Sequence, residues 1–390
     1  MFGWEFPPLH TGGLGVACEG LVRGLRKNGV NVTLVLPHRT TADGVDVRVP
    51  DGMDVVAVES MLQAYDDHDS FDVRLSAGIP GDINLYGPDL GAAVERYTAQ
   101  SVTLTRDVRP DVVHCHDWMT YAAGVCAAKH HDAPLVAHIH ATELDRTDFH
   151  PHPWIAARER AGLLAANSVI AVSNYTKSLL VEHYGIPDRK ITVVHNGHDP
   201  KVAPLVAQHG KKRGPLILFL GRLTVQKNPS QFLDVARLVR AMRPDVRFVM
   251  AGEGPMLGEL MRRACALGLD NAVTFTGRVS KEEAEALFRQ ADCFVMPSLS
   301  EPFGLVALEA IGHGVPVILS KQSGASEVIE HAFKVDFWDA DKMADCILTI
   351  LREQPLARQL RSEAPRILQR LSWQRQAGAV RSLYEHLLRI

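Results

Sequence analysis

Short apolar runs rich in β-branched residues alternate with longer amphipathic stretches along most of this chain. Strands that alternate with helix-length segments are typical of βαβ units, in which parallel strands form a sheet covered by helices. The amphipathic stretches include residues 17–27, 230–242 and 281–291. The expected strands are 32–36, 112–114, 135–139, 169–172, 217–220, 248–250, 273–275, 293–297 and 315–318. The alternation therefore predicts an α/β protein with doubly wound, Rossmann-like parallel sheets.

The length of 390 residues indicates more than one domain, because single hydrophobic cores stop growing at roughly 250–300 residues. A polar, turn-rich stretch at residues 196–215 interrupts the alternation, and a new apolar strand follows it directly. We therefore predict one domain over residues 1–199 and a second over residues 213–372. Residues 41–90 are less regular, and the run 66–69 and the turn 80–82 within them are predicted to be surface loops.

The composition argues against several classes of function. A net charge of −3 provides no basic surface for nucleic acid. The six cysteines never form a C-x-x-C pair, so we expect reduced, mostly buried thiols rather than disulfides or a zinc site. The first residues lack the basic start and apolar stretch of a signal peptide, and no segment resembles a membrane span. These features predict a cytoplasmic protein and give no indication of its oligomeric state.

Two carboxylates, Glu301 and Glu309, bracket a Pro-Phe-Gly turn that follows the apolar run 293–297. After the turn, apolar residues recur at helical spacing, so Gly304 is expected at the start of a helix. The free N–H groups and the dipole of such a helix start attract phosphate. One carboxylate before the turn and one inside the helix suit hydroxyls on either side of a diphosphate, as in a nucleotide sugar. An acidic helix start with a solvated glutamate would give the same pattern.

Cationic residues follow another predicted strand of the same half of the chain. Arg222 and Lys227 come directly after strand 217–220 and lead into a helix. A guanidinium can bind phosphate oxygens in a bidentate manner, and a lysine supplies a point charge. Two cations at one strand end suit a departing diphosphate, although solvated surface cations are an equally common outcome. The turns at 251–255 and 277–279 are placed to contact a nucleoside.

The first half of the chain contains a glycine-rich turn and a histidine-rich region. Residues 7–15 precede a helical pattern and suit the close approach of a phosphate or sugar to the backbone, or simply a tight turn. In the sequence His114-Cys-His-Asp-Trp118, Asp117 and Trp118 lie at a strand end, where they can hydrogen-bond and stack on a sugar. Strand alternation places His138 and His140 on one face, with His140 nearer the carboxyl end. A sugar contact or a core hydrogen bond would both suit His140, and a metal site is the least favoured interpretation.

Taken in order, these motifs resemble a retaining glycosyltransferase of the GT-B fold, family 4, and also the related glycogen and starch synthases. The resemblance covers essentially the whole chain, and the two most specific motifs are Arg222/Lys227 and the Glu301…Glu309 pair. It implies two Rossmann-like domains facing across a cleft and a hexosyltransferase activity. The motifs that carry it are Gly12-Gly13, His116-Asp117-Trp118, His140, Ser173, Asn196-Gly197, Arg222/Lys227 and Glu301…Glu309. A combination of three further motifs is similar to a glycogen-synthase-like bacterial subgroup: Pro-Pro-x-x-x-Gly-Gly-Leu-Gly at 7–15, His-Ala-Thr-Glu at 140–143 and Lys334-Val-Asp-Phe-Trp338.

The resemblance also implies roles for single residues. Arg222 and Lys227 would neutralise the donor diphosphate, Glu301 would bind donor sugar hydroxyls, and Glu309 would bind the ribose. His140 would contact the donor sugar near the anomeric carbon. The remaining donor-binding residues would be Gly13 over the phosphate, Phe303, Gly304 and Leu305 through backbone N–H groups, and Arg278 and Val279 against the base. Residues 373–390 would form a helix that crosses back onto the first domain.

One departure affects the donor. The glycogen synthases carry a lysine just before the Gly-Gly pair, whereas this chain has His10-Thr11. The donor base therefore stays open between UDP, ADP and GDP, with glucose the expected sugar and a saccharide, such as an α-glucan, the expected acceptor. No cofactor and no metal are expected, because the nucleotide sugar is itself the substrate.

The spacing of the glutamates constrains the mechanism. Retaining hydrolases hold two carboxyl groups about 5 Å apart, whereas Gly304 to Glu309 alone spans roughly 7.5 Å of helix. We therefore expect front-face transfer with diphosphate departure rather than a glutamate nucleophile. The competing hypotheses are a sugar-nucleotide epimerase of related fold, a non-catalytic sugar-nucleotide-binding protein and, least favoured, a zinc hydrolase built on His114, His116 and His140.

Overall fold

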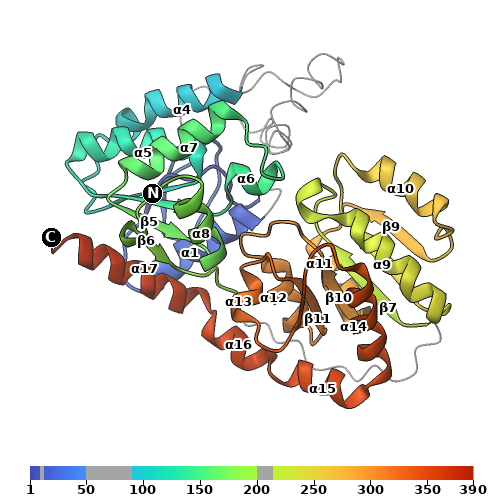
Figure 1. The fold of residues 1–390 in the computed structure, drawn as a ribbon. Helices are drawn as coiled ribbons and strands as arrows, with labels where there is room; N and C mark the ends of the chain where they lie inside the picture. Colours follow the sequence, from blue (N-terminus) through green and yellow to red (C-terminus); the bar gives the residue numbers. More distant parts are fainter. Residues whose placement is uncertain (9–12, 50–89, 200–213, 390) are drawn as a thin grey trace. The chain divides into compact units, whose positions relative to one another are not determined.

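The computed structural model describes residues 1–8, 13–49, 90–199 and 214–389. The chain divides into two compact units (Figure 1). Unit 1 comprises Met1–Gly197 together with Leu371–Ile390, and unit 2 comprises His198–Arg370. The first division lies two residues before the predicted end of the first domain at residue 199, and the segment 200–213 lies outside the described residues.

Unit 2 contains one parallel sheet of six strands in the order β12-β11-β10-β7-β8-β9. The strand order reverses at β7, because β8 and β9 continue on one side while β10 pairs with β7 on the other. Ligands of open α/β sheets bind at such a switch point, outside the carboxyl ends of the strands. The strands are β7 (Leu216–Leu220), β8 (Arg247–Ala251), β9 (Val273–Gly277), β10 (Cys293–Met296), β11 (Val317–Ser320) and β12 (Phe333–Val335).

Helices connect these parallel strands. Since βαβ crossovers are right-handed, the reversal of strand order places the helices after β7 and β10 on opposite faces of the sheet. The first of them, α9, packs against α14, and the second, α12, packs against α16. The helices of unit 2 are η3 (Val225–Lys227), α9 (Pro229–Met242), α10 (Leu257–Ala266), α11 (Lys281–Gln290), α12 (Leu305–Gly312), α13 (Ala325–Val328), α14 (Ala340–Arg352), α15 (Gln354–Ser362) and α16 (Ala364–Arg370).

Unit 1 is built on parallel strands as well. Strands β3 (Val113–His116), β4 (Leu135–Ile139), β5 (Ser168–Ala171) and β6 (Ile191–Val193) pair in that order, and β1 (Thr33–Val35) pairs with β2 (Asp46–Arg48). Phe2 forms parallel bridges to Val35 and to Cys115, so the first residues of the chain join the two groups of strands. The helices of unit 1 are α1 (Gly13–Lys27), α4 (Leu90–Thr105), α5 (Trp118–His131), α6 (Glu143–Arg146), α7 (Pro153–Ala165), α8 (Asn174–Glu182), η2 (Asp188–Lys190) and α17 (Trp373–Leu387).

The last helix, α17, lies against α1 (Figure 1). Two glycines of α1 permit this close approach. A Cβ atom on Gly20 would lie 2.1 Å from the ring of Trp373, and one on Gly24 would lie 2.6 Å from the Trp373 carbonyl oxygen. Trp373 is itself buried, so the absence of two side chains on α1 creates the surface on which the end of the chain packs.

The predicted doubly wound α/β architecture is confirmed, and every predicted strand is present. The last of them begins at Val317 rather than 315, as expected where Pro316 lacks a backbone N–H for the sheet. In the less regular segment 41–90, Asp46–Arg48 form β2 beside β1, and the predicted surface loops at 66–69 and 80–82 lie outside the described residues. The rest of that segment, from residue 50 to 89, lies outside the described residues. All six cysteines are free thiols, and Cys126 and Cys265 are exposed.

Candidate active site

In unit 2, two loops at the switch point of the sheet are held together by one glutamine. The loop after β7 contains Gln226, whose side chain is buried. Its Nε2 donates to the Ser300 carbonyl over 3.1 Å, and the backbone carbonyl of Gln226 accepts from the Leu299 N–H over 2.9 Å. The loop after β10 is therefore fixed against the loop after β7, which brings together the two most specific motifs of the sequence.

Lys227 and Glu301 form an ion pair at this junction. Lys227 Nζ lies 2.5 Å from Glu301 Oε2, and the Ser298 hydroxyl donates to the same oxygen over 3.3 Å. The Lys227 side chain is 20% exposed and that of Glu301 only 7%. Arg222, half-buried, follows the same strand as Lys227. The site thus presents a cation and a carboxylate side by side, suited to a ligand with both negative charge and hydroxyl groups.

The backbone after Glu301 turns sharply into α12. Gly304 has φ +99°, in the region that favours glycine, and a Cβ there would lie 2.9 Å from Met296 Cε and 3.3 Å from Glu301 Cγ. The Phe303 carbonyl accepts from the Ala325 N–H over 2.6 Å, which ties the turn to α13. Leu305 is the first residue of α12, where N–H groups have no acceptor within the helix. This predicted anion-binding helix start is therefore present beside the ion pair.

Glu309 lies in the second turn of α12 and is half-buried. Burial raises the pKa of Glu309 to about 7, and the neighbouring Glu285 acts in the same direction while Lys281 opposes it. The carboxyl group consequently changes charge near neutral pH. It is not the solvated helix glutamate that the sequence pattern alone would also allow.

Arg278 and Val279 follow β9, farther along the same edge of the sheet. Arg278 is exposed and Val279 half-buried. The Arg278 N–H donates to Glu253 Oε1 over 3.3 Å, and the Gly252 N–H donates to the Gly277 carbonyl over 2.9 Å. The loops after β8 and β9 are thereby joined; β8 is the neighbour of β7, and β9 lies one strand farther along the sheet.

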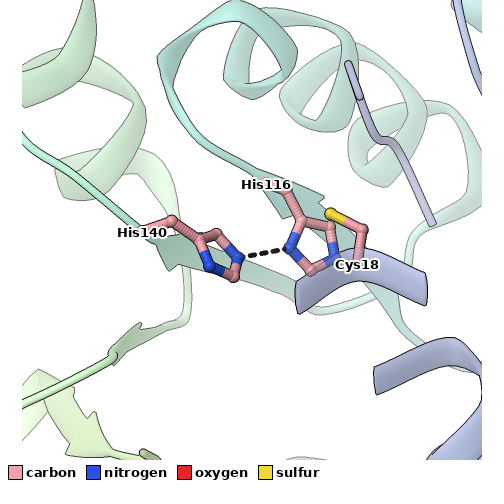
Figure 2. Close-up of side chains that lie close together, drawn as sticks. All are labelled: Cys18, His116 and His140. Carbon is pink, nitrogen blue, oxygen red and sulfur yellow. Dashed lines mark hydrogen bonds between the residues drawn. The ribbon is translucent and has the colours of Figure 1, made fainter. Parts of the chain in front are cut away.

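In unit 1, four histidines lie together at the ends of β3 and β4. As the alternation predicts, His138 and His140 share a face, with ring centroids 4.3 Å apart. His114 and His116 stack likewise at 4.5 Å. The two stacks are hydrogen-bonded to each other, His114 Nε2 to His138 Nδ1 over 3.3 Å and His116 Nδ1 to His140 Nε2 over 3.0 Å (Figure 2 shows the second pair).

Burial lowers the pKa of all four imidazoles, so the cluster is neutral at physiological pH. In each hydrogen-bonded pair, one ring therefore donates and the other accepts. His114 Nδ1 also bonds the hydroxyl of Tyr384, which lies on α17. The sequence motif alone gave no sign of this partner, because 270 residues separate the two side chains.

Asp117 fixes the backbone beside His140. Its Oδ1 accepts from the His140 N–H over 2.7 Å, and its Oδ2 lies 3.4 Å from Arg146 Nη2. Asp117 has φ +58° and is buried, as is Trp118, whose ring meets Trp154 edge-on at 5.6 Å. We predicted that Asp117 and Trp118 contact a sugar. The Asp117 carboxylate supports His140 in this way, and a sugar contact of the two residues stays a prediction.

An acidic side chain that the sequence analysis missed underlies this region. Glu159 on α7 is buried, and burial raises its pKa to about 8. It accepts from the Glu143 N–H over 3.0 Å and from the Tyr184 hydroxyl. An isolated glutamate within the largely apolar segment 153–165 was the available signal.

Gly13 is the exposed first residue of α1, and residues 9–12 before it lie outside the described residues, so its contact with phosphate stays a prediction. Among the described residues, the groups with ligand atoms close enough for a metal ion are Cys18/His116/His140 and His114/His116/His138. The helices described in the structure include none with the length and hydropathy to span a membrane.

Protein-family models match both units of the chain. The model described as Glycosyltransferase Family 4 matches residues 11–202, and the model described as Glycosyl transferases group 1 matches residues 204–367. An uncharacterised glycosyltransferase of Methanocaldococcus jannaschii is 31% identical over 373 residues, 89% of this chain and 86% of the relative. The glycogen synthase of Mycobacterium tuberculosis is 29% identical over 403 residues, 98% of this chain and 93% of the relative.

Solved structures with the same fold cover both units. Sucrose-phosphate synthase from Thermosynechococcus elongatus has a TM-score of 0.75 at 20% identity, covering 99% of this chain and 95% of that one. The catalytic domain of Arabidopsis thaliana starch synthase IV, bound to ADP and acarbose, has a TM-score of 0.73 at 17% identity, covering 100% and 99%. Anabaena HepE with UDP-glucose has a TM-score of 0.70 at 19% identity, covering 98% and 99%.

Proposed function

This chain belongs to the family 4 glycosyltransferases of the GT-B fold, and on that premise we propose that it transfers a glucosyl residue from a nucleoside diphosphate sugar to a saccharide acceptor with retention of anomeric configuration. One observation carries this proposal. The Lys227–Glu301 ion pair lies at the switch point of the unit 2 sheet, beside the start of α12. A diphosphate sugar matches this pair, because its phosphates suit the ammonium group and its hydroxyls suit the carboxylate.

Donor binding separates the ion pair in this proposal. Lys227 and Arg222 bind the diphosphate, whose negative charge grows as the glycosidic bond breaks. The N–H groups at the start of α12, including that of Leu305, bind the same phosphates. Glu301, released from Lys227, accepts hydrogen bonds from sugar hydroxyls. Glu309 accepts them from the ribose, and Arg278 and Val279 lie against the base.

Neither glutamate is the nucleophile of a double displacement. Glu301, once released from Lys227, is occupied by sugar hydroxyls, and Glu309 lies five residues beyond Gly304 on the helix, roughly 7.5 Å along its axis. We therefore propose front-face transfer, in which the departing phosphate removes the proton of the acceptor hydroxyl. His140 contacts the transferred sugar near the anomeric carbon, held in place by Asp117 and His116.

Glucose as the transferred sugar is supported by the relatives. HepE binds UDP-glucose, starch synthase IV binds ADP and acarbose, and a glycogen synthase aligns over 98% of this chain. These names favour elongation of an α-glucan, with UDP or ADP as the donor base. The proposal includes no metal ion, because lysine, arginine and the helix start supply the positive charge.

The experiment is a donor panel with defined acceptors. UDP-, ADP- and GDP-glucose are each incubated with maltooligosaccharides in the presence of EDTA, and NMR follows the anomeric protons of donor and product. An α-linked product from an α-linked donor is expected, and a β-linked product or a covalent glycosyl adduct on Glu301 would refute the mechanism. Conversion of donor without acceptor would indicate an epimerase. Binding of donor with no turnover under any condition would indicate a sugar-nucleotide-binding protein.

A further inference from the structure

A cysteine on α1 lies beside the histidine pair of unit 1. Cys18 projects from α1 toward His116, which is hydrogen-bonded to His140 (Figure 2). One sulfur and one nitrogen from each histidine lie within 4.8 Å of one another. Cys18 and His116 are essentially buried, and His140 is 9% exposed. None of the roles proposed above uses the thiol.

Two ring nitrogens of this group have no hydrogen-bond partner among the described residues. They are His116 Nε2 and His140 Nδ1, both shielded from water. Buried polar atoms in proteins nearly always have a partner, and an unoccupied ion site is a recognised reason for an exception. Only one of the two can hold a lone pair, because one ring of the pair donates. When His116 Nδ1 donates to His140 Nε2, the lone pair is on His116 Nε2, which faces Cys18, while His140 Nδ1 carries the proton and faces away from the thiol (Figure 2). A buried, unpaired lone pair is what a metal ion requires, and His140 would bind the same ion through Nε2.

The charge around the group favours a cation. The carboxylates of Asp117 and Glu5 are the charged groups that act on Cys18. The same carboxylates attract a positive ion. Arg146 opposes them at His140, but it lies 3.4 Å from Asp117 and is partly neutralised there.

We propose that Cys18, His116 and His140 form a binding site for a thiophilic divalent cation, Zn²⁺ or Cd²⁺, and that its occupation inhibits transfer. A thiolate with two imidazoles is a ligand set that zinc prefers, and it leaves a fourth position for water. Tetrahedral bonds would separate the ligand atoms by about 3.3–3.6 Å. The ligand atoms lie up to 4.8 Å apart in the structure, so the side chains must move closer to one another by roughly 1 Å when the ion binds. Binding releases one proton, that of the thiol, to solvent.

The second group of three histidines is less suited to an ion. It offers no thiolate. His114 uses Nδ1 toward the Tyr384 hydroxyl and Nε2 toward His138, so an ion there would break a buried hydrogen bond, just as an ion on His140 Nε2 would break the bond to His116. His116 belongs to both groups, and an ion held by Cys18 would exclude the other arrangement. The thiol therefore decides which group binds.

Inhibition follows from the proposed function, on which this part of the inference rests. An ion on His140 removes the imidazole that contacts the transferred sugar and breaks its bond to His116. Donor binding in unit 2 uses Lys227, Glu301 and Glu309 and does not involve the ion. The cation should accordingly lower kcat while the affinity for the nucleotide stays constant.

The test uses the full chain in reductant-free buffer and has two separate readouts. Co²⁺ titration reports coordination directly, since a thiolate ligand gives a ligand-to-metal charge-transfer band and tetrahedral geometry gives strong d–d bands. Zn²⁺ competition then gives the affinity. Cys18→Ala should abolish the charge-transfer band and weaken Zn²⁺ binding at least about 100-fold. Cys126→Ala, which removes an exposed thiol, is the matched control and should change neither.

Transfer rates are measured with and without Zn²⁺, each variant being normalised to its own metal-free rate. Wild-type inhibition that Cys18→Ala relieves supports the inference. Inhibition that persists in Cys18→Ala, or a wild-type cobalt spectrum without thiolate charge transfer, would overturn it. Cys18→Ser and His116→Gln repeat the cobalt measurement if the alanine variant unfolds. If the protein transfers no sugar at all, the proposed function fails, whereas the cobalt spectrum still decides the site.

Discussion

Replacement of Lys227 by methionine distinguishes a structural role of the Lys227–Glu301 pair from a catalytic one. Methionine retains the length of the lysine side chain and removes its charge. The Glu301 carboxylate, only 7% exposed, would then keep the Ser298 hydroxyl as a side-chain donor. Loss of one partner of a fully buried ion pair costs about 3–5 kcal/mol. Because the Lys227 side chain is 20% exposed, water screens part of this cost, and we expect about 2 kcal/mol.

Activity should fall by a different amount and for a different reason. Lys227 is proposed to stabilise the charge that develops on the departing diphosphate. Removal of one such donor typically lowers kcat about 10²–10³-fold. Glu301→Gln removes the opposite charge. In the double variant Lys227→Met/Glu301→Gln both side chains are neutral, so neither leaves a buried charge without a partner.

The four proteins form a double-mutant cycle. Urea unfolding of the full chain should show that the double variant is more stable than the sum of the single losses, by about 1–2 kcal/mol. Its transfer rate should nevertheless be no higher than that of either single variant. If activity recovers together with stability, then Lys227 only supports the fold of the loop, and the assignment of its ammonium group to the diphosphate is wrong.

Four further predictions use other contacts of the two units. Gly304→Ala, which forces a side chain into φ +99° against Glu301, should destabilise the chain by about 1–3 kcal/mol in urea unfolding and reduce transfer. The affinity for UDP-glucose, measured by calorimetry, should rise about tenfold from pH 6 to pH 8. Ribose binding favours the ionised form of Glu309, whose pKa in the free protein is about 7. Glu309→Gln should remove this pH dependence. Asp117→Ala removes the acceptor of the His140 N–H and should lower kcat/KM at least about tenfold, with nucleotide affinity unchanged in a binding assay. Gly20→Ala should displace α17 and cost about 1–3 kcal/mol, detected by tryptophan fluorescence during unfolding; unchanged stability would show that α17 does not need this contact.

The pH dependence has a second consequence for stability. Glu309 binds its proton more tightly in the folded chain than in the unfolded one, so between about pH 4.5 and pH 7 the folded state holds the additional proton. Its contribution to stability is present at the acidic end of this window and is lost as the pH rises through 7. Nucleotide binding and folding stability are therefore expected to change in opposite directions over the same range.

The sequence alone determined where the strands and helices form and which strands are followed by polar residues. Alternation of apolar runs with amphipathic segments is a local property, because strand and helix periodicities are set by the backbone of each segment. For the same reason, the positions of Lys227, Glu301 and His140 just beyond strands could be predicted. The motifs were also sufficient to identify the family, because each motif is a short stretch of neighbouring residues that can be read directly from the sequence.

Only the tertiary structure decided which of these residues meet. Lys227 and Glu301 are 74 residues apart and form a pair because β10 lies next to β7, a choice of strand order that no local pattern encodes. Burial likewise decided the states of the ionisable groups, raising the pKa of Glu309 and lowering that of His140. The thiol of Cys18 beside the histidines follows from the packing of α1 on the sheet. Charge state and proximity depend on the surroundings in space, and sequence distance does not determine them.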